Sequence, residues 1–222
     1  MADQLNMHDE DDQLAAAKRF WHNYAKPVLG GIVIAGAGLL AWNWWQDHRE
    51  AQAEAASIQY QQLTQIVSIE NPGADERETA QQLIDTLRDQ YASTLYADLA
   101  GLIQARLAVD AGELDAAYAA LAAVRDDSSR EEIDALAGLD QARIALGRGD
   151  GEEALSIIAS LSLPDTLAAR GADIRGDALY ALGRQEEARS AWQDAIALAR
   201  EHQQALSGTQ LKLDDLPPAE AS

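Results

Sequence analysis

Apolar residues recur at every third or fourth position along most of this chain, the spacing that places side chains on one face of an α-helix. Beyond residue 45 this spacing continues without a helix-breaking residue until Asn71-Pro72-Gly73, where Pro next to Gly indicates that a helix ends. Much of the apolar content is Ala, and the 222 residues include one Phe, which favours closely packed helices over a β-sheet core. The pattern therefore predicts an all-α fold.

The chain contains an internal repeat from about residue 78 onward. The segments ETAQQLIDTL, GELDAAYAALAAV, GDGEEALSIIASL and GRQEEARSAWQDAI place an alanine at comparable positions, Ala80, Ala117, Ala154 and Ala188, which are 37, 37 and 34 residues apart. The last three segments each follow a helix-length stretch and a turn with a glycine, at Gly112, Gly149 and Gly183. The predicted unit is a helical hairpin, and stacked hairpins form a solenoid.

The last of these units resembles a tetratricopeptide repeat. In RGDALYALGRQEEARSAWQDAIAL the family's small, large and turn positions fall on Gly176, Leu179, Gly183, Ala188, Trp192 and Ala195. Small residues permit close helix contact while Leu179 and Trp192 fill the space between helices. We therefore expect these residues, with Gly112, Ala117 and Ala154, to serve packing, and we assign residues 46–206 to a tetratricopeptide-like domain.

Residues 27–45, PVLGGIVIAGAGLLAWNWW, contain no charged residue. A helix of this length spans ~28 Å, close to the ~30 Å hydrocarbon core of a bilayer. Aromatic residues lie before the stretch and at its end, the latter being Trp42, Trp44 and Trp45, and such residues favour the two membrane interfaces. The stretch therefore predicts a single transmembrane helix. Two alternatives are a signal peptide cleaved near Ala35-Gly36-Ala37 and a buried helix of a soluble protein.

The basic residues near this stretch are unevenly distributed. Lys18, Arg19 and Lys26 precede it, whereas Arg49 alone follows within twenty residues. The positive-inside rule therefore predicts a cytoplasmic N-terminus and a repeat domain on the far side of the membrane. We expect residues 1–13 to be a disordered cytoplasmic tail, residues 14–26 a juxtamembrane helix, and residues 207–222 a largely disordered C-terminal tail.

Charge and composition exclude several kinds of chemistry. The net charge of −20 argues against a nucleic-acid partner bound through phosphates. The chain has no Cys, and its four His residues have no metal-ligand spacing, so we expect no metal. Paired carboxylates such as Glu152 and Glu153 begin predicted helices, where the helix dipole favours negative charge. No phosphate-binding or nucleophile motif occurs, so we expect neither a cofactor nor an enzyme.

Stacking in the manner of tetratricopeptide repeats would place the first helix of each hairpin along a concave groove. Carrying the family's groove positions onto this sequence gives twelve candidates: Leu99, Leu102, Arg106, Val109, Leu136, Leu139, Arg143, Leu146, Arg170, Asp173, Asp177 and Tyr180. An apolar lining with Arg at matching positions suits an extended or partly unfolded polypeptide. The alternative is that many of these leucines are core between adjacent repeats.

Three stretches together resemble the YfgM family, an ancillary subunit of the bacterial Sec translocon. They are KRFWHNYAKPVLGGIVIAGAGLLAWNWWQDH, YADLAGLIQARLAVDAGELDAAYAALAAV, and RGDALYALGRQEEARSAW with the later LKLDDL. The resemblance implies a single-pass bacterial inner-membrane protein with a periplasmic repeat domain and no catalytic residues. It also implies that the SecYEG translocon, a PpiD-like periplasmic chaperone and exported polypeptides are the partners. A different hypothesis is a regulatory or structural membrane protein that acts through its cytoplasmic segment, for example by sequestering a response regulator.

Overall fold

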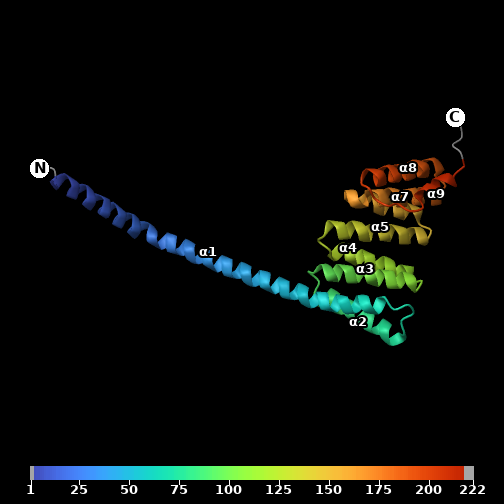
Figure 1. The fold of residues 1–222 in the computed structure, drawn as a ribbon, viewed down its shortest axis with the longest axis horizontal. Coiled ribbons are helices and arrows are strands. Elements are labelled where there is room, and N and C mark those ends of the chain that lie inside the picture. The colour runs from blue at the N-terminus through green and yellow to red at the C-terminus, as the bar shows by residue number, and fades with distance from the viewer. Residues whose placement is uncertain (1–2, 218–222) are drawn as a thin grey trace. The chain divides into compact units, whose positions relative to one another are not determined.

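The computed structural model describes the backbone of residues 3–217 and the side chains of residues 35–217. Every element in these ranges is an α-helix (Figure 1), which confirms the predicted fold class for the described part of the chain. The helices are α1 (Asp3–Val67), α2 (Ala74–Gln90), α3 (Leu95–Asp110), α4 (Leu114–Asp127), α5 (Glu131–Gly147), α6 (Gly151–Ser160), α7 (Asp165–Ala181), α8 (Gln185–Glu201) and α9 (Thr209–Asp214).

The chain divides into two compact units, Met1–Gln52 and Ala53–Ser222, and α1 is continuous across their boundary. Helix α1 begins at Asp3, whereas residues 1–13 were expected to form a disordered tail. No Pro or Gly occurs between Asp3 and Lys26, and the helical hydrogen-bond ladder therefore meets no breaker there. The same helix includes residues 14–26 and 27–45.

The predicted membrane span lies only partly among residues with described side chains. Within residues 35–217, no helix is long and apolar enough to cross a membrane. Residues 27–34 and the basic residues Lys18, Arg19 and Lys26 lie outside that range. At the other end of the stretch, Trp42 and Trp44 are exposed, and Trp45 packs at 5.3 Å from the Trp42 ring with Arg49 over its face.

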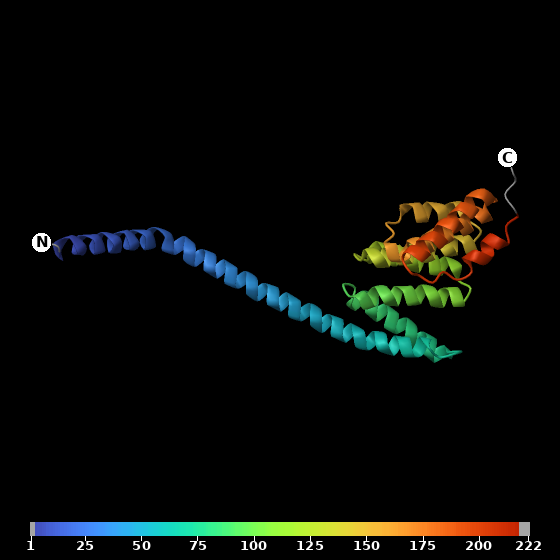
Figure 2. The same cartoon turned by 45° about the horizontal axis from the view of Figure 1, so that its top comes forward.

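The second unit contains the predicted helical hairpins, which Figure 2 shows turned by 45° from the view of Figure 1. The turns between α3 and α4, α5 and α6, and α7 and α8 contain Gly112, Gly149 and Gly183. All three glycines have a positive φ, between 75° and 84°, which a residue with a Cβ adopts only at a cost. The predicted unit of helix, Gly turn and helix is therefore confirmed for these hairpins.

Small residues bring the helices of each hairpin together. The repeat alanines Ala117, Ala154 and Ala188 are completely buried, and Ala80 is 2% exposed. In the last hairpin Gly176 of α7 faces the indole of Trp192 on α8, and both residues are buried. Leu179 packs in the same cluster as Trp192. These contacts place the buried repeat residues between the helices, whereas Gly112 and Gly183 are exposed turn residues at which an added Cβ would meet nothing within 4 Å.

The end of the chain departs from the prediction. Residues 207–222 were expected to be largely disordered, but α9 lies within this segment and packs against α8. Leu216 is buried in a cluster with Leu179 and Trp192, and Thr209 is completely buried. Leu213 and Leu216 are three residues apart, as on one helix face, but two residues are too few to predict a helix from periodicity alone.

Candidate functional site

The candidate groove positions on α3 and α5 are partly exposed. Arg106 extends along the α3 surface to Asp110, with 3.2 Å between Nε and Oδ2, and Val109 is 41% exposed. On α5, Arg143 is exposed and pairs with Asp140. Leu99, Leu102, Leu136 and Leu146 are half-buried. Leu139 is an incorrect candidate, because it is completely buried in the core between α5, α6 and α7.

The candidate positions on α7 contact other parts of the chain. Arg170 pairs with Asp140 of α5, and burial lowers the pKa of its guanidinium. Tyr180 is 53% exposed and lies 5.7 Å from the Trp192 ring. Asp173 and Asp177 were predicted to line a groove, but both bind Lys212 of α9. We therefore correct their assignment from groove lining to the attachment of α9.

The attachment of α9 is a small polar cluster. Lys212 Nζ lies 2.9 Å from Asp173 Oδ1 and 2.6 Å from Asp177 Oδ1, and the hydroxyl of Thr209 donates to Asp173 Oδ1 over 2.8 Å. Trp192 Nε1 donates to the Asp177 carboxylate over 3.1 Å. Burial raises the pKa of Asp177 above its usual 3.8, although Lys212 opposes the shift. Sequence periodicity missed this cluster because its partners are separated by more than thirty residues.

Two hydrogen bonds between Arg and Gln side chains recur at the spacing of the repeat; we call them polar bridges. Arg88 Nη1 of α2 donates to Gln104 of α3 over 2.9 Å, and Arg125 Nη1 of α4 donates to Gln141 of α5 over 3.0 Å. The two arginines are 37 residues apart, and so are the two glutamines. Ala80 and Ala117 have the same spacing. The repeat register could therefore have predicted these bridges. They join the second helix of one hairpin to the first helix of the next.

The junction between α6 and α7 lacks this bridge, and a cleft lies beside it. Its equivalent positions hold Ser162 and Arg175, and Arg175 pairs instead with Asp194 of α8 over 3.0 Å. Helix α6 ends at Ser160 after 10 residues, whereas α8 has 17. A cleft of about 580 Å³ lies between α6 and α8, with Leu155, Ile158 and Leu198 in its lining. We call it the α6–α8 cleft.

A larger cleft of about 790 Å³ lies between α2 and α4, over the C-terminal half of α3. We call it the α2–α4 cleft. Its lining includes Gln104, Leu107, Ala108 and Asp110 of α3 and Ala111 just after the helix. At 100° per residue Gln104, Leu107 and Ala108 lie on a different side of α3 from Arg106, whereas Asp110 lies beside Arg106 and pairs with it. The assignment of binding positions to a single concave face therefore missed this surface.

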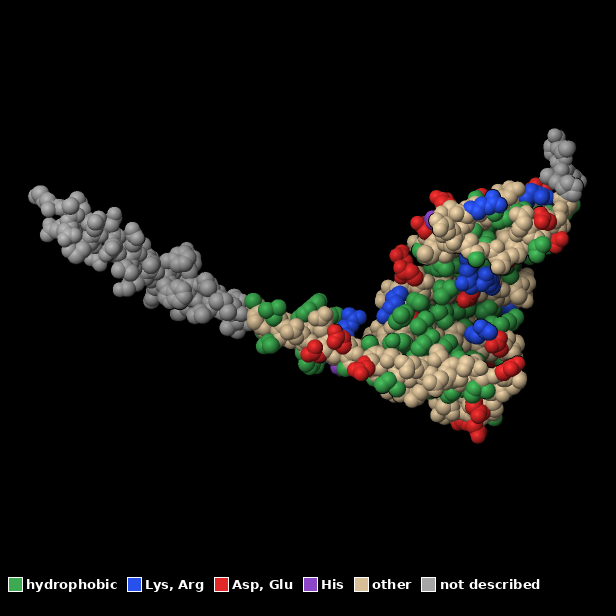
Figure 3. Space-filling view, viewed as in Figure 1, with side chains coloured by type: hydrophobic (Ala, Val, Ile, Leu, Met, Phe, Trp, Pro, Cys, Tyr) green, Lys and Arg blue, Asp and Glu red, His purple; other side chains and the backbone are tan. Residues whose placement is uncertain are grey.

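The described surface has features that suit contact with another polypeptide. Within residues 35–217 no group of three or more His, Asp or Glu side chains could hold a metal ion. On the face of residues 53–217 seen in Figure 3, apolar side chains gather along the middle, with Lys and Arg beside them. Half-buried apolar side chains next to charged ones suit contact with another polypeptide.

Comparison with known proteins relates this chain to one family model and to relatives that share one name. Residues 18–218 match the family described as "Tetratricopeptide repeat-like domain". Over 193 residues the chain is 31% identical to a protein of Escherichia coli (strain K12) named "Ancillary SecYEG translocon subunit", a match that covers 85% of this chain and 87% of the relative.

Two further relatives carry the same name. The chain is 31% identical to the protein of Aggregatibacter actinomycetemcomitans over 46% of this chain and 47% of the relative. It is 26% identical to that of Haemophilus influenzae (strain ATCC 51907 / DSM 11121 / KW20 / Rd) over 51% of this chain and 52% of the relative. The chain therefore belongs to the family of ancillary SecYEG translocon subunits, the YfgM family, and carries its tetratricopeptide repeat-like domain.

Proposed function

We propose that this protein is a membrane-anchored interaction module that associates with the SecYEG translocon. The observation that carries the proposal is the 31% identity over 85% of the chain to a protein named as an ancillary subunit of that translocon. A tetratricopeptide repeat-like subunit is a non-enzymatic kind of protein. Stacked helical hairpins provide extended surfaces for binding other polypeptides.

The anchor in this proposal is the uncharged stretch 27–45, with the N-terminus in the cytoplasm and the repeat domain in the periplasm. Supporting this assignment, Leu39 and Leu40 are 66% and 72% exposed, and Trp44 is 71% exposed. Apolar side chains exposed along one helix suit a lipid or protein environment better than water. The basic residues before residue 27 support the orientation.

The clients in this proposal are exported polypeptides, which the repeat domain receives together with a PpiD-like periplasmic chaperone. Support comes from the partly exposed Leu99, Leu102 and Leu136, which lie near the arginines Arg106 and Arg143 along the chain. Such a surface offers apolar contacts and donors for backbone carbonyls.

Photo-crosslinking in intact cells tests this function. A photoreactive residue replaces Arg106 or Arg143 in the full chain, and a matched control carries it at the exposed Ser156 of α6. We expect adducts with SecYEG subunits, the chaperone or a radiolabelled exported protein from Arg106 and Arg143, and fewer from Ser156. If neither groove position yields any of these named adducts, the proposed function is wrong.

A further inference from the structure

Different side chains occupy the space between the second helices of successive hairpins. Between α4 and α6, Tyr118 reaches across and its hydroxyl donates to Glu153 Oε1 over 2.7 Å. The guanidinium of Arg148 lies 5.0 Å from the centre of the same ring. Tyr118 also packs against the cores on both sides. An aromatic ring, a cation and a carboxylate therefore close this interval.

The interval between α6 and α8, which contains the α6–α8 cleft, has apolar side chains at these positions. Positions are compared by their distance from the repeat alanine of their own hairpin. Tyr118, one residue after Ala117, corresponds to Leu155, one residue after Ala154. Arg148, six residues before Ala154, corresponds to Leu182, six residues before Ala188. Both leucines are half-buried, and Leu155 packs against the cores of the last two hairpins. Apolar side chains thus take the place of the aromatic ring and its cation.

The first interval has neither arrangement. The positions that correspond to Tyr118, Arg148 and Glu153 are Gln81, Ala111 and Ala116. All three line the α2–α4 cleft of about 790 Å³. The cleft therefore exists because an aromatic ring, a guanidinium and a carboxylate are replaced by shorter side chains in this one repeat. Its size lies within the range of known ligand pockets.

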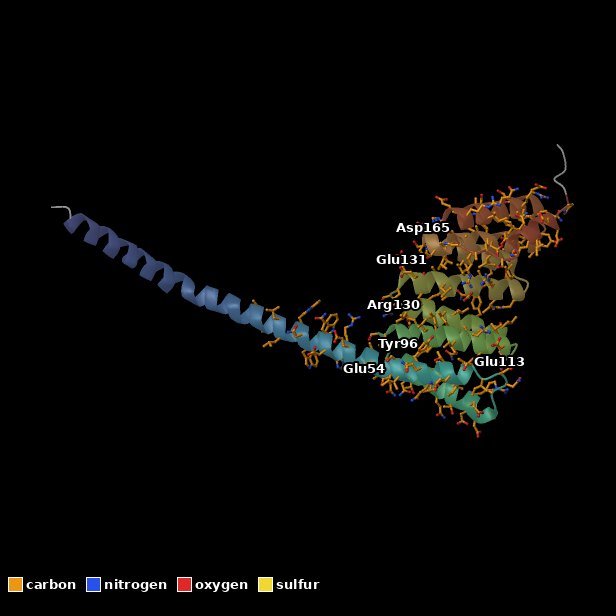
Figure 4. All side chains as sticks on the ribbon, viewed as in Figure 1. Glu54, Tyr96, Glu113, Arg130, Glu131 and Asp165 are labelled. Carbon is orange, nitrogen blue, oxygen red and sulfur yellow. The ribbon has the colours of Figure 1, made fainter. Side chains whose placement is uncertain are left out.

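The remaining lining defines the chemistry of an occupant. The apolar part of the lining includes Leu107 and Ala108 of α3 and Ile66, Val67 and Ile69 at and just after the end of α1. Three carboxylates, Glu70, Asp110 and Glu113, line the cleft together with the cation Arg77. Asp110 already pairs with Arg106, so Glu70 and Glu113 are the lining carboxylates that the described ion pairs leave for a ligand. Glu113 is labelled at the start of α4 in Figure 4. Residues 47–222 contain 14 basic and 32 acidic residues, a net charge of −18. This charge favours a basic partner and opposes a second copy of the chain.

We propose that the α2–α4 cleft binds a basic polypeptide segment through one large apolar side chain. That side chain, best an aromatic one, enters the space that corresponds to the Tyr118 ring in the next repeat, and basic residues beside it pair with Glu70 and Glu113. This binding site adjoins the groove side of α3 at Asp110, which pairs with Arg106, and it does not depend on the translocon association.

A peptide titration tests the proposal with the full chain in nonionic detergent. The probe is fluorescein-labelled Lys-Lys-Ser-Trp-Ser-Lys-Lys, followed by fluorescence anisotropy in low-salt buffer, with empty micelles as the blank. We expect saturable binding that weakens at least tenfold when Trp in the peptide is replaced by Ala, and that disappears when its Lys residues are replaced by Glu. No saturable binding, or equal binding of the Ala peptide, would overturn the proposal.

Two protein variants locate the binding. The triple variant Gln81→Tyr, Ala111→Arg and Ala116→Glu installs the closing residues of the next repeat, and we expect at least tenfold weaker binding of the Trp peptide. Circular dichroism and thermal unfolding verify that this variant is folded. Binding within twofold of the unsubstituted chain refutes the cleft as the site.

The second variant does not depend on filling the cleft. Glu70→Gln with Glu113→Gln changes two exposed side chains and is expected to weaken binding about threefold to tenfold, as removal of two exposed ion pairs would. The matched control, Glu152→Gln with Glu186→Gln, makes the same charge change on exposed residues of α6 and α8. Equal loss in both variants would show a general charge effect and overturn the proposal. So would sedimentation showing that the cleft joins two copies, with dimers lost only in the triple variant.

Discussion

Replacing Gly176 with Ala tests the close packing of α7 and α8. An added Cβ would approach Cδ1, Nε1 and Cε2 of Trp192 at 2.9 Å or less, closer than carbon atoms approach in a packed core. Trp192 is 3% exposed, and its Nε1 donates to Asp177. The indole cannot retreat without losing this hydrogen bond or disturbing Leu179 in the same cluster.

The expected magnitude combines three effects. Overpacking a core costs about 1–3 kcal/mol, and losing the indole hydrogen bond costs about 1 kcal/mol. Replacing a helical Gly with Ala stabilises the folded state by about 1 kcal/mol. The net loss is therefore roughly 1–3 kcal/mol in the free energy of unfolding, concentrated in the last hairpin because repeats depend mainly on their neighbours.

Urea unfolding of the full chain in detergent, followed by far-ultraviolet circular dichroism, measures this loss. The matched control is Gly147→Ala, because a Cβ at Gly147 would meet Leu114 at an ordinary 3.8 Å; this change should leave stability unaltered or raise it by up to about 1 kcal/mol. The double variant with Trp192→Leu should lose less than the sum of its two single changes. A Gly176→Ala variant as stable as the Gly147→Ala variant would refute the packing argument.

Three further changes probe the polar contacts. Lys212→Met leaves Asp173 buried without its cation, so α9 should detach at a cost of roughly 2 kcal/mol and limited proteolysis should cut the segment after α8 faster. Arg125→Ala leaves the amide of Gln141, 4% exposed, without its donor, and unfolding should become easier by about 1–3 kcal/mol; an unchanged urea midpoint would contradict the bridge. Because the pKa of Asp177 is raised above 3.8, its folded form binds a proton before its unfolded form does. Relative to Asp177→Asn, the unsubstituted chain should therefore gain stability as the pH falls through the raised pKa towards 3.8, and a parallel pH dependence of the two would contradict this.

Local patterns predicted the hairpins well. The glycine turns and the buried repeat alanines depend on residues close in sequence, since a positive φ and a close helix contact both require a small side chain at one position. The register of 37 residues also contained the Arg88–Gln104 and Arg125–Gln141 bridges, although a bridge is recognised only when residues of successive repeats are compared.

The candidate surface was harder to predict because exposure depends on distant segments. Leu139 has the spacing of a groove residue, yet three helices bury it. Asp173 and Asp177 look like groove residues until α9, more than thirty residues later, places Lys212 against them. The α2–α4 cleft arises because Gln81, Ala111 and Ala116 are shorter than the corresponding residues of the next repeat. Periodicity detects the apolar residues that are present and gives no signal for a side chain that is missing.

The open first interval should also make α2 less protected than α8. Both are second helices of 17 residues, and each borders a cleft. Helix α8 is also held by Trp192, by α9 and by the Asp194–Arg175 pair, whereas no described helix packs on α2 as α9 packs on α8. Local unfolding is favoured where few buried contacts hold an element, so α2 amides should exchange with deuterium faster than α8 amides in the full chain. The Gln81→Tyr, Ala111→Arg and Ala116→Glu variant should slow exchange in α2 and leave α8 unchanged. Faster exchange in α8 than in α2 would contradict this reasoning, because it would mean that the cleft exerts no effect on the helix beside it.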